Sequence, residues 1–317
     1  MRAYRTAALV AAFFLCLAAH AFEVKYFDVP RGSQPHDVAP APDGTVWYTA
    51  QAKGELGRLD PASGRIDRFP LGRGSAPHGV IVGPDGAAWV TDGGLNAIVR
   101  VDAATKAVKV FPLPRGTPYT NLNTAAFDRN GILWYTGQSG YYGRVDPRSG
   151  EVKVWEAPRG SGPYGITAAP AGDVYYASLA GNHIARIDIA TGRAQPIDPP
   201  TKAQGARRVW SDSKGRIWVS EWNAGQVALY DPASGTWREW HAPHPNAHVY
   251  AVWVDENDAA WVCDWSEGTL LRFDPSTEKF ERATADGGYA NVRQLSGRRG
   301  ETWGAESGND RLVRVTR

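Results

Sequence analysis

The chain has 317 residues, of which 43% are hydrophobic and 21% are charged, and its formal net charge is +2. Its first 21 residues hold Arg2 and Arg5 but no acidic residue, so the rest of the chain has no net charge. Composition therefore predicts neither a nucleic acid nor an anionic membrane surface as the partner.

The N-terminus has the pattern of a secretory signal peptide. Arg2 and Arg5 precede a short apolar run, and the small residues Ala19 and Ala21 precede Phe22. The run is too short for a retained membrane span. We expect residues 1–21 to be a signal peptide, residues 22–317 to form one domain, and the mature protein to be secreted or periplasmic. Because Cys263 is the one cysteine beyond residue 21, an apolar core has to stabilise the domain without a disulfide.

Seven copies of one motif fill residues 22–317. Each copy contains an apolar stretch, a tight turn such as Pro84-Asp85-Gly86, an aromatic-bearing strand, and a further strand that precedes a second turn. The aromatic residue recurs every 41 to 45 residues, at Trp47, Trp89, Trp134, Tyr175, Trp218, Trp261 and Trp303. Four short strands per copy, repeated seven times, predict an all-β fold: a seven-bladed β-propeller.

The two ends of the chain complement each other. The last copy stops at its third strand, residues 312–317, while residues 22–32 resemble the fourth strand at 150–160. The N-terminal strand is therefore predicted to complete the last blade and close the ring, which removes an exposed sheet edge. We expect the closed ring to be a monomer.

Most recurring residues are interpreted as structural. The tryptophans are predicted to be wedges between blades, because a large apolar side chain repeated once per blade fills the same space each time. The aspartates that follow the third strands are interpreted as turn caps; they are Asp60, Asp102, Asp146, Asp188, Asp231 and Asp274. Function is therefore sought where the copies differ.

Three rows of residues are predicted at one mouth of the central channel, on the face opposite the first hairpin turns. Eleven residues before the aromatic lie His36, His78, Asn123, Tyr164, Arg207, Tyr250 and Val292. The next position holds Asp37, Gly79, Thr124, Gly165, Arg208, Ala251 and Arg293, and a one-residue change in turn length would exchange the two rows. Three residues after the aromatic come Ala50, Asp92, Gly137, Ser178, Glu221, Asp264 and Glu306.

Three consecutive blades contribute carboxylates to the third row. Glu221, Asp264 and Glu306 carry the hard oxygen ligands that Mg²⁺ or Ca²⁺ prefers, so they are candidate metal ligands. Carboxylates and arginines that neutralise each other in a structural ring are an equally open interpretation.

Histidines, arginines and aromatic residues supply candidates for catalysis and binding. His78 and His36 are candidate general bases, although each is also interpreted as capping a neighbouring blade. Arg208 and Arg293 suit bidentate capture of a carboxylate. The aromatic side chains predicted to complete a substrate site are Tyr250, Tyr164, Trp222 and Trp265.

The repeat resembles that of one known family. The segments Pro77-His78-Gly79-Val80, Pro84-Asp85-Gly86, Trp89-Val90-Thr91-Asp92 and Ile98-Val99-Arg100-Val101 are similar to those of virginiamycin B lyases, also called streptogramin lyases. The resemblance implies a seven-bladed propeller that opens the ring of type B streptogramins by elimination, with Mg²⁺ and a histidine base in the last repeat. That histidine position corresponds here to Val292, or to Arg293 if the turn is one residue shorter. One glutamate position corresponds to Ala290 and the other to Glu306.

Three functions remain open from the sequence. The first is a metal-dependent C–O lyase acting on a cyclic ester or related small molecule, with a rearranged site. The second is a non-catalytic propeller that binds an anionic or aromatic ligand at the channel mouth. The third is a lactone hydrolase of the gluconolactonase type, which the repeats resemble less.

Overall fold

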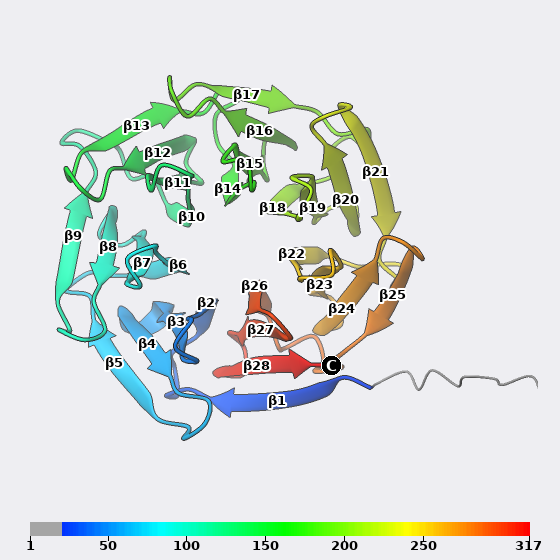
Figure 1. The fold of residues 1–317 in the computed structure, drawn as a ribbon, viewed down its shortest axis with the longest axis horizontal. Coiled ribbons are helices and arrows are strands. Elements are labelled where there is room, and N and C mark those ends of the chain that lie inside the picture. Colours follow the sequence, from blue (N-terminus) through cyan, green and yellow to red (C-terminus); the bar gives the residue numbers. More distant parts are fainter. Residues whose placement is uncertain (1–20) are drawn as a thin grey trace, which may run out of the picture.

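The computed structural model describes residues 21–317, so the predicted signal peptide, apart from Ala21, lies outside the described residues. Seven four-stranded antiparallel sheets surround a central axis (Figure 1). The predicted all-β, seven-bladed β-propeller is thus confirmed. In the described part of the chain, no helix is long and apolar enough to cross a membrane.

Each blade runs from an inner strand at the axis to an outer strand at the rim. The inner strands are β2 (Pro35–Pro40), β6 (Pro77–Val82), β10 (Leu122–Phe127), β14 (Pro163–Ala168), β18 (Ala206–Ser211), β22 (Val249–Val254) and β26 (Val292–Arg298). The second strands are β3 (Val46–Ala50), β7 (Ala88–Asp92), β11 (Leu133–Gly137), β15 (Val174–Ser178), β19 (Ile217–Glu221), β23 (Ala260–Asp264) and β27 (Glu301–Glu306).

The third and outer strands complete the sheets. The third strands are β4 (Glu55–Leu59), β8 (Ala97–Val101), β12 (Tyr141–Val145), β16 (His183–Ile187), β20 (Gln226–Asp231), β24 (Thr269–Asp274) and β28 (Arg311–Thr316). The outer strands are β1 (Glu23–Asp28), β5 (Ile66–Pro70), β9 (Val108–Pro112), β13 (Val152–Glu156), β17 (Ala194–Ile197), β21 (Thr236–His241) and β25 (Lys279–Arg282). A short 3₁₀ helix, η1 (Gln51–Lys53), follows β3.

The N-terminal strand closes the ring. Strand β1 pairs antiparallel with β28, from Glu23 opposite Thr316 to Asp28 opposite Arg311, and so forms the outer edge of the last blade. In Figure 1 the blue β1 lies beside the red β28. The predicted closure is confirmed, and it lets the two ends of the chain complete one sheet.

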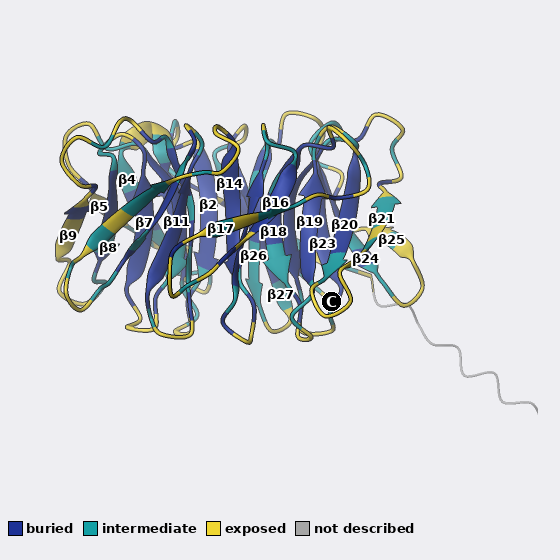
Figure 2. Ribbon diagram, turned by 90° about the horizontal axis from the view of Figure 1, so that it is seen from above, coloured by how far each residue is buried: buried dark blue, intermediate teal, exposed yellow. Residues whose placement is uncertain are grey.

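The recurring tryptophans are buried between blades, as predicted. Trp47 of the first blade packs with Val80 and Val90 of the second, and its exposed fraction is 1%. Several indole N–H groups also donate to an acidic side chain at the first hairpin of their own blade; the bond from Trp134 to Asp128 is 2.9 Å long. The strands are mostly buried and the loops lie exposed at the two faces (Figure 2). One side chain therefore fills the interblade space and anchors its turn.

The aspartates after the third strands cap turns, again as predicted. Asp60 accepts the backbone N–H of Ala62 at 3.0 Å, and Asp146 accepts that of Arg148 at 2.9 Å. The pKa of Asp60 is lowered by the Ser63 hydroxyl and by this backbone bond, and the pKa of Asp146 by its bond from Arg148. The six aspartates therefore need no catalytic explanation.

Each inner strand carries an irregularity near the channel mouth. In six blades the register with the second strand slips across two residues, for example between Pro35 and Val38 in the first blade and between Ala206 and Val209 in the fifth. In the second blade one residue, His78, lies in the slip between Pro77 and Gly79. A bulge of this kind redirects side chains. Two successive residues can thus approach the channel where a regular strand would present one.

A repeated polar contact holds these bulges to the neighbouring blade. The hydroxyl of Thr91 accepts the Gly79 N–H at 2.9 Å and donates to the Asn123 carbonyl of the next blade at 2.5 Å. Thr49, Thr136 and Ser220 make equivalent contacts. The Cys263 thiol replaces the hydroxyl in the sixth blade, with both contacts between 3.1 and 3.2 Å. The lone buried cysteine therefore belongs to a structural series.

Candidate functional site

The channel mouth is lined by one residue from each inner strand. Because Val292 pairs with Glu306, as Val249 pairs with Asp264 in the preceding blade, the next residue, Arg293, takes the position that Tyr250 has there. The alternative left open by the sequence is thereby resolved. The row at the mouth contains His36, His78, Asn123, Tyr164, Arg207, Tyr250 and Arg293.

The second row lies one step deeper and nearly fills the channel. A cavity of about 20 Å³ is lined there by residues that include Thr124, Gly165, Arg208, Ala251 and Gln294. That volume suits about one water molecule. Gly165 permits the close approach, because a Cβ atom at this position would lie 2.6 Å from the Cα of Arg208. A small-molecule ligand therefore does not fit at this depth of the channel.

Arg208 crosses the channel and ties four blades together. Its Nη2 donates to Asp37 Oδ1 at 2.9 Å and its Nη1 to Asp37 Oδ2 at 3.3 Å. Nη1 also reaches the Thr124 hydroxyl at 2.7 Å, and Nη2 the Arg293 carbonyl at 3.4 Å. The residue is 4% exposed. Arg208 was expected to bind substrate, but its terminal nitrogens already have partners inside the protein.

Asp37 connects this arginine to a histidine. Its Oδ1 accepts the His36 Nδ1–H at 2.8 Å, so three N–H donors converge on the carboxylate. Burial raises the pKa of Asp37 and the Arg208 charge opposes that rise. Because the neighbours supply donors and no acceptor, the arrangement is that of an ionised carboxylate.

His36 is held as a neutral imidazole. Burial lowers its pKa well below the usual value, and the charges of Arg208, Arg293 and Arg207 lower it further. With Nδ1 donating to Asp37, the lone pair lies on Nε2. Nε2 has no hydrogen-bond partner within residues 21–317. This atom therefore has a free lone pair at the mouth of the channel.

His78 has a different environment. Its Nδ1 donates to the Asn123 carbonyl at 3.0 Å, and its Nε2 accepts from the Asn123 amide at 3.2 Å. Burial lowers its pKa well below the usual value. The His78 and His36 rings lie against each other, with centroids 3.7 Å apart. Of the two candidate bases, His78 has both nitrogens occupied, so the geometry favours His36.

Arginine and aromatic side chains surround the mouth on the opposite side. The Tyr164 and Tyr250 hydroxyls meet at 2.5 Å, and Arg207 Nη2 donates to Tyr164 at 3.2 Å. Despite its burial, the pKa of Tyr164 is lowered by the charges of Arg207 and Arg208. Trp265 stacks on Tyr250, with centroids 5.1 Å apart, and Trp222 meets Tyr250 edge-on. The four aromatic residues predicted for a substrate site thus lie together.

The three carboxylates proposed as metal ligands do not come together. Within residues 21–317, the one group of three metal-ligand side chains is His36, Asp37 and His78, whose ligand atoms lie within 4.8 Å of one another. Each of the predicted carboxylates lies at the end of a second strand, where it bonds within its own blade. The structure therefore does not bring Glu221, Asp264 and Glu306 into one such group.

The local partners explain each case. Asp264 Oδ1 accepts the backbone N–H groups of His248 and Ser266, which makes it a loop cap. Glu306 Oε2 accepts from Arg311 and Asn309. Glu221 Oε2 accepts from Gln226 at 2.5 Å, and burial raises the pKa of Glu221 to about 8. A carboxyl group with that pKa is largely uncharged at neutral pH.

The Mg²⁺ that the resemblance implies does not fit the last blade. The structural register places Arg293 at the channel position, and a guanidinium is neither a metal ligand nor a base. Ala290 and Val292 are buried in an apolar cluster and offer no ligand atom. Nor does the group at His36 suit a cation without rearrangement, because Arg208 occupies both Asp37 oxygens and Asn123 occupies both His78 nitrogens.

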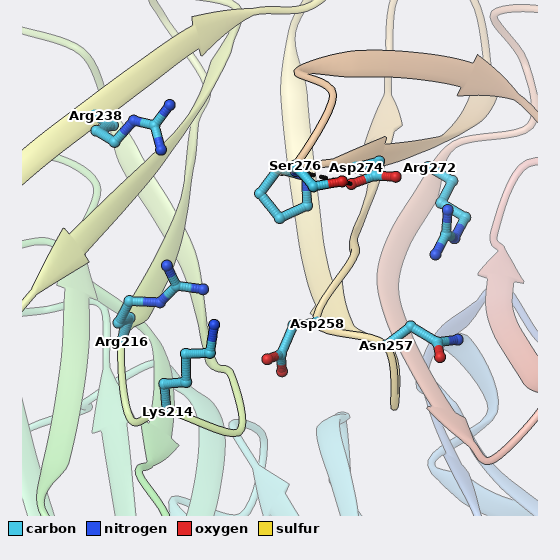
Figure 3. A pocket seen from close by; sticks show the side chains of 9 residues that line it. Lys214, Arg216, Arg238, Asn257, Asp258, Arg272, Asp274 and Ser276 are labelled. Atoms are coloured by element: carbon cyan, nitrogen blue, oxygen red, sulfur yellow. Dashed lines mark hydrogen bonds between the residues drawn. The ribbon is translucent and has the colours of Figure 1, made fainter.

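A cavity on the opposite face has a different character. It has a volume of about 360 Å³ and lies between the fifth and sixth blades (Figure 3). Its arginines are paired with carboxylates: Arg216 with Asp212 and Arg272 with Asp255. Asp274, shown with its bond to Ser276, caps a turn. Arg238 likewise pairs with Glu278, so the three arginines of this cavity have partners within the protein.

Two further residues of the site belong to the predicted rows, although the sequence pattern assigns them no role. Asp37 orients His36, and Arg207 lies between Tyr164, Tyr250 and Trp222. Both rows are predicted at the channel mouth, and the bulges bring residues of both to the channel. A charged residue adjacent to another candidate, as in His36-Asp37 and Arg207-Arg208, was the available signal.

Comparisons with known proteins agree with this fold. A structure described as a streptogramin B lyase has a TM-score of 0.85 and 22% identity, over 93% of this chain and 97% of the other. A virginiamycin B lyase from Staphylococcus aureus has a TM-score of 0.86 and 20% identity, over 93% and 99%. At these identities the structural match shows the fold alone. A search of curated proteins by sequence finds no significant match. The profile of the virginiamycin B lyase family matches residues 15–273, so the chain belongs to the virginiamycin B lyase family.

Proposed function

We propose that the protein is an exported lyase that opens a cyclic ester, or a related small molecule, by C–O elimination at the channel mouth. Family membership supports the reaction class. The observation that carries the proposal is the Asp37–His36 pair, in which Asp37 fixes the imidazole and leaves the Nε2 lone pair without a partner in the described residues. A carboxylate that orients a histidine is a recurrent arrangement for a general base.

In this reaction His36 Nε2 takes a proton from the carbon next to a substrate carbonyl. The electron pair of that C–H bond forms a carbon–carbon double bond while the ester C–O bond breaks, and the leaving oxygen becomes a carboxylate. Negative charge that develops on the substrate carbonyl is stabilised by the Arg207 guanidinium and the Tyr164 hydroxyl, which bond to each other at 3.2 Å. The proton on His36 then leaves to solvent.

The test is turnover of a panel of cyclic esters followed by mass spectrometry. Elimination leaves the mass of a single-ring substrate unchanged, whereas hydrolysis adds one water, so the product mass also tests the lactone hydrolase alternative. His36→Gln should lower the rate by about 10² to 10⁴. The matched control is His183→Gln, because His183 is also a buried histidine but lies on a third strand. A type B streptogramin should be a poor substrate, since Arg293 holds the position of the family base.

A non-catalytic binding function is the second candidate. The His36 side chain is 3% exposed, which favours a ligand that rests above it without proton transfer. Saturable binding of panel compounds without any product would support this function. Turnover with an unchanged rate in His36→Gln would exclude His36 as the base.

A further inference from the structure

Three arginines face the channel mouth, but a single carboxylate there forms an ion pair with one of them. Asp37 forms its ion pair with Arg208. Neither Arg207 nor Arg293 has an ion-pair partner within residues 21–317, and both are partly buried. His36 and His78 remain neutral, because burial lowers the pKa values of both. The mouth therefore carries two uncompensated positive charges.

Arg207 is held in place by aromatic rings. Its guanidinium carbon lies 3.4 Å from the ring centroid of Tyr250, 4.3 Å from that of Trp222 and 5.0 Å from that of Tyr164. Its Nη2 donates to the Tyr164 hydroxyl, while its buried Nε has no partner. Stacking of this kind orients the planar donor group before a ligand arrives.

Arg293 is positioned in a similar way from the last blade. Its Nε donates to the Ser307 hydroxyl at 2.8 Å, which leaves the two terminal nitrogens without a partner among the described side chains. The guanidinium lies 5.2 Å from the ring centroid of Trp265. Trp265 in turn stacks on Tyr250, the residue over which Arg207 lies. One aromatic cluster thus supports both arginines.

Both charges act at the same place. Besides burial, the charges of Arg208, Arg293 and Arg207 all lower the pKa of His36. The positive potential of these arginines therefore extends to the His36 imidazole. Such a potential favours an anion at the mouth. A guanidinium fork matches the two oxygens of a carboxylate, and the partly buried rings of Trp222 and Trp265 offer apolar surface beside it.

We propose that Arg207 and Arg293 bind a carboxylate group of the ligand, whose aromatic or other apolar part packs on Trp222 and Trp265. This names the substrate class of the proposed lyase and so rests on that function. The binding step is nevertheless independent of turnover. A substrate of this class is an organic acid with an apolar body. Its carboxylate supplies the negative charge that pairs with the two arginines.

The experiment compares benzoate with its neutral isostere benzamide, by calorimetric titration of the purified protein. Benzoate should bind at least about tenfold more tightly than benzamide, because a charge-assisted hydrogen bond contributes about 1.5 to 3 kcal/mol. Arg207→Gln and Arg293→Gln should each weaken benzoate binding about tenfold or more and leave benzamide binding nearly unchanged. Added salt should weaken benzoate binding alone.

Two matched variants keep the result interpretable. Arg144→Gln is the control, because Arg144 also lies over a tryptophan, Trp134, without an ion pair, but on a third strand away from the channel. It should bind benzoate normally. His36→Gln should also bind benzoate, so failure of the lyase function is distinguishable from failure of the anion site. Equal affinity for benzoate and benzamide in the wild type, or normal benzoate binding in both channel arginine variants, would overturn the proposal.

Discussion

The inner strands and the second strands place their polar residues in different ways. On the inner strands, bulges bring His36 and Asp37 of the first blade and Arg208 of the fifth blade to the channel, and the three side chains form one network across it. At the ends of the second strands, Asp264 and Glu306 pair in regular register with the third strands and bond within their own blades. Residues that recur at one repeat position thus converge on the axis only where the strand departs from regular geometry.

This difference between the two sets of strands decides which residues we assign to catalysis and which to stability. The network of the inner strands contains a neutral histidine fixed by an ionised carboxylate, which suits proton transfer. The carboxylates of the second strands cap loops or form local pairs, which suits stability. If this division is right, substitutions in the two sets should have different sizes and different pH dependences.

The largest effect is expected for Asp37→Ala, which leaves the Arg208 guanidinium buried without its carboxylate. Breaking a buried ion pair by removing one partner costs about 3–5 kcal/mol of unfolding free energy. Glu306→Gln should cost about 1 kcal/mol, because Arg311 is partly exposed and keeps its second ion pair, with Asp286. Urea denaturation measures both. The double variant Asp37→Ala with Arg208→Met should recover much of the loss, and similar losses for Asp37→Ala and Glu306→Gln would contradict the division.

The next largest effect is the contribution of Glu221 to the pH dependence of the unfolding free energy. Its folded-state pKa of about 8 lies above the ordinary value of 4.5, so folding favours the protonated acid. The stabilisation is complete below about pH 4.5 and is lost as the pH rises through 8. Between these limits the wild type should lose about 2–4 kcal/mol relative to Glu221→Gln, allowing for partial solvent screening. Unfolding free energies of the wild type and of Glu221→Gln, measured at about pH 5 and about pH 8.5, test this prediction. Parallel pH dependences of the two proteins would refute it.

A smaller effect should separate two members of the series that anchors the bulges. Thr91→Val removes the contacts to the Gly79 N–H and the Asn123 carbonyl, and should cost about 1–3 kcal/mol. Cys263→Ser keeps both kinds of contact and should cost less than about 1 kcal/mol. Thermal and urea unfolding compare them. A larger loss in the serine variant would mean that packing of the thiol, and not its hydrogen bonds, matters at this position.

The smallest effect is expected from divalent cations. If Glu221, Asp264 and Glu306 shared one ion, a hundredfold excess over its dissociation constant would stabilise the fold by about 2.7 kcal/mol. Because the three carboxylates bond within separate blades, neither Mg²⁺ nor Ca²⁺ should shift the melting temperature. A shift that disappears in Asp264→Asn would restore the shared site.

Much of the fold could be predicted from the sequence, because a repeat transmits the same information seven times. The position of Trp89 in one blade predicted the burial of the tryptophan in the others, and residues 22–32 matched an outer strand. The site depended on details that do not repeat. A last hairpin that is one residue shorter moved Arg293 into the mouth, and the bulges made Asp37 and Arg208 partners across the channel. No local pattern specifies such a pair between distant blades.

The most direct test of the account is the protonation state of His36. Nitrogen NMR of the imidazole, assigned with His36→Gln, should show a neutral ring at pH 7 with the proton on Nδ1 and a bare Nε2. The neutral ring with its proton on Nδ1 is expected because Asp37 accepts the Nδ1–H and because burial among three arginines disfavours the imidazolium. A charged His36 ring at neutral pH, or a proton on Nε2, would contradict the assignment of His36 as the base.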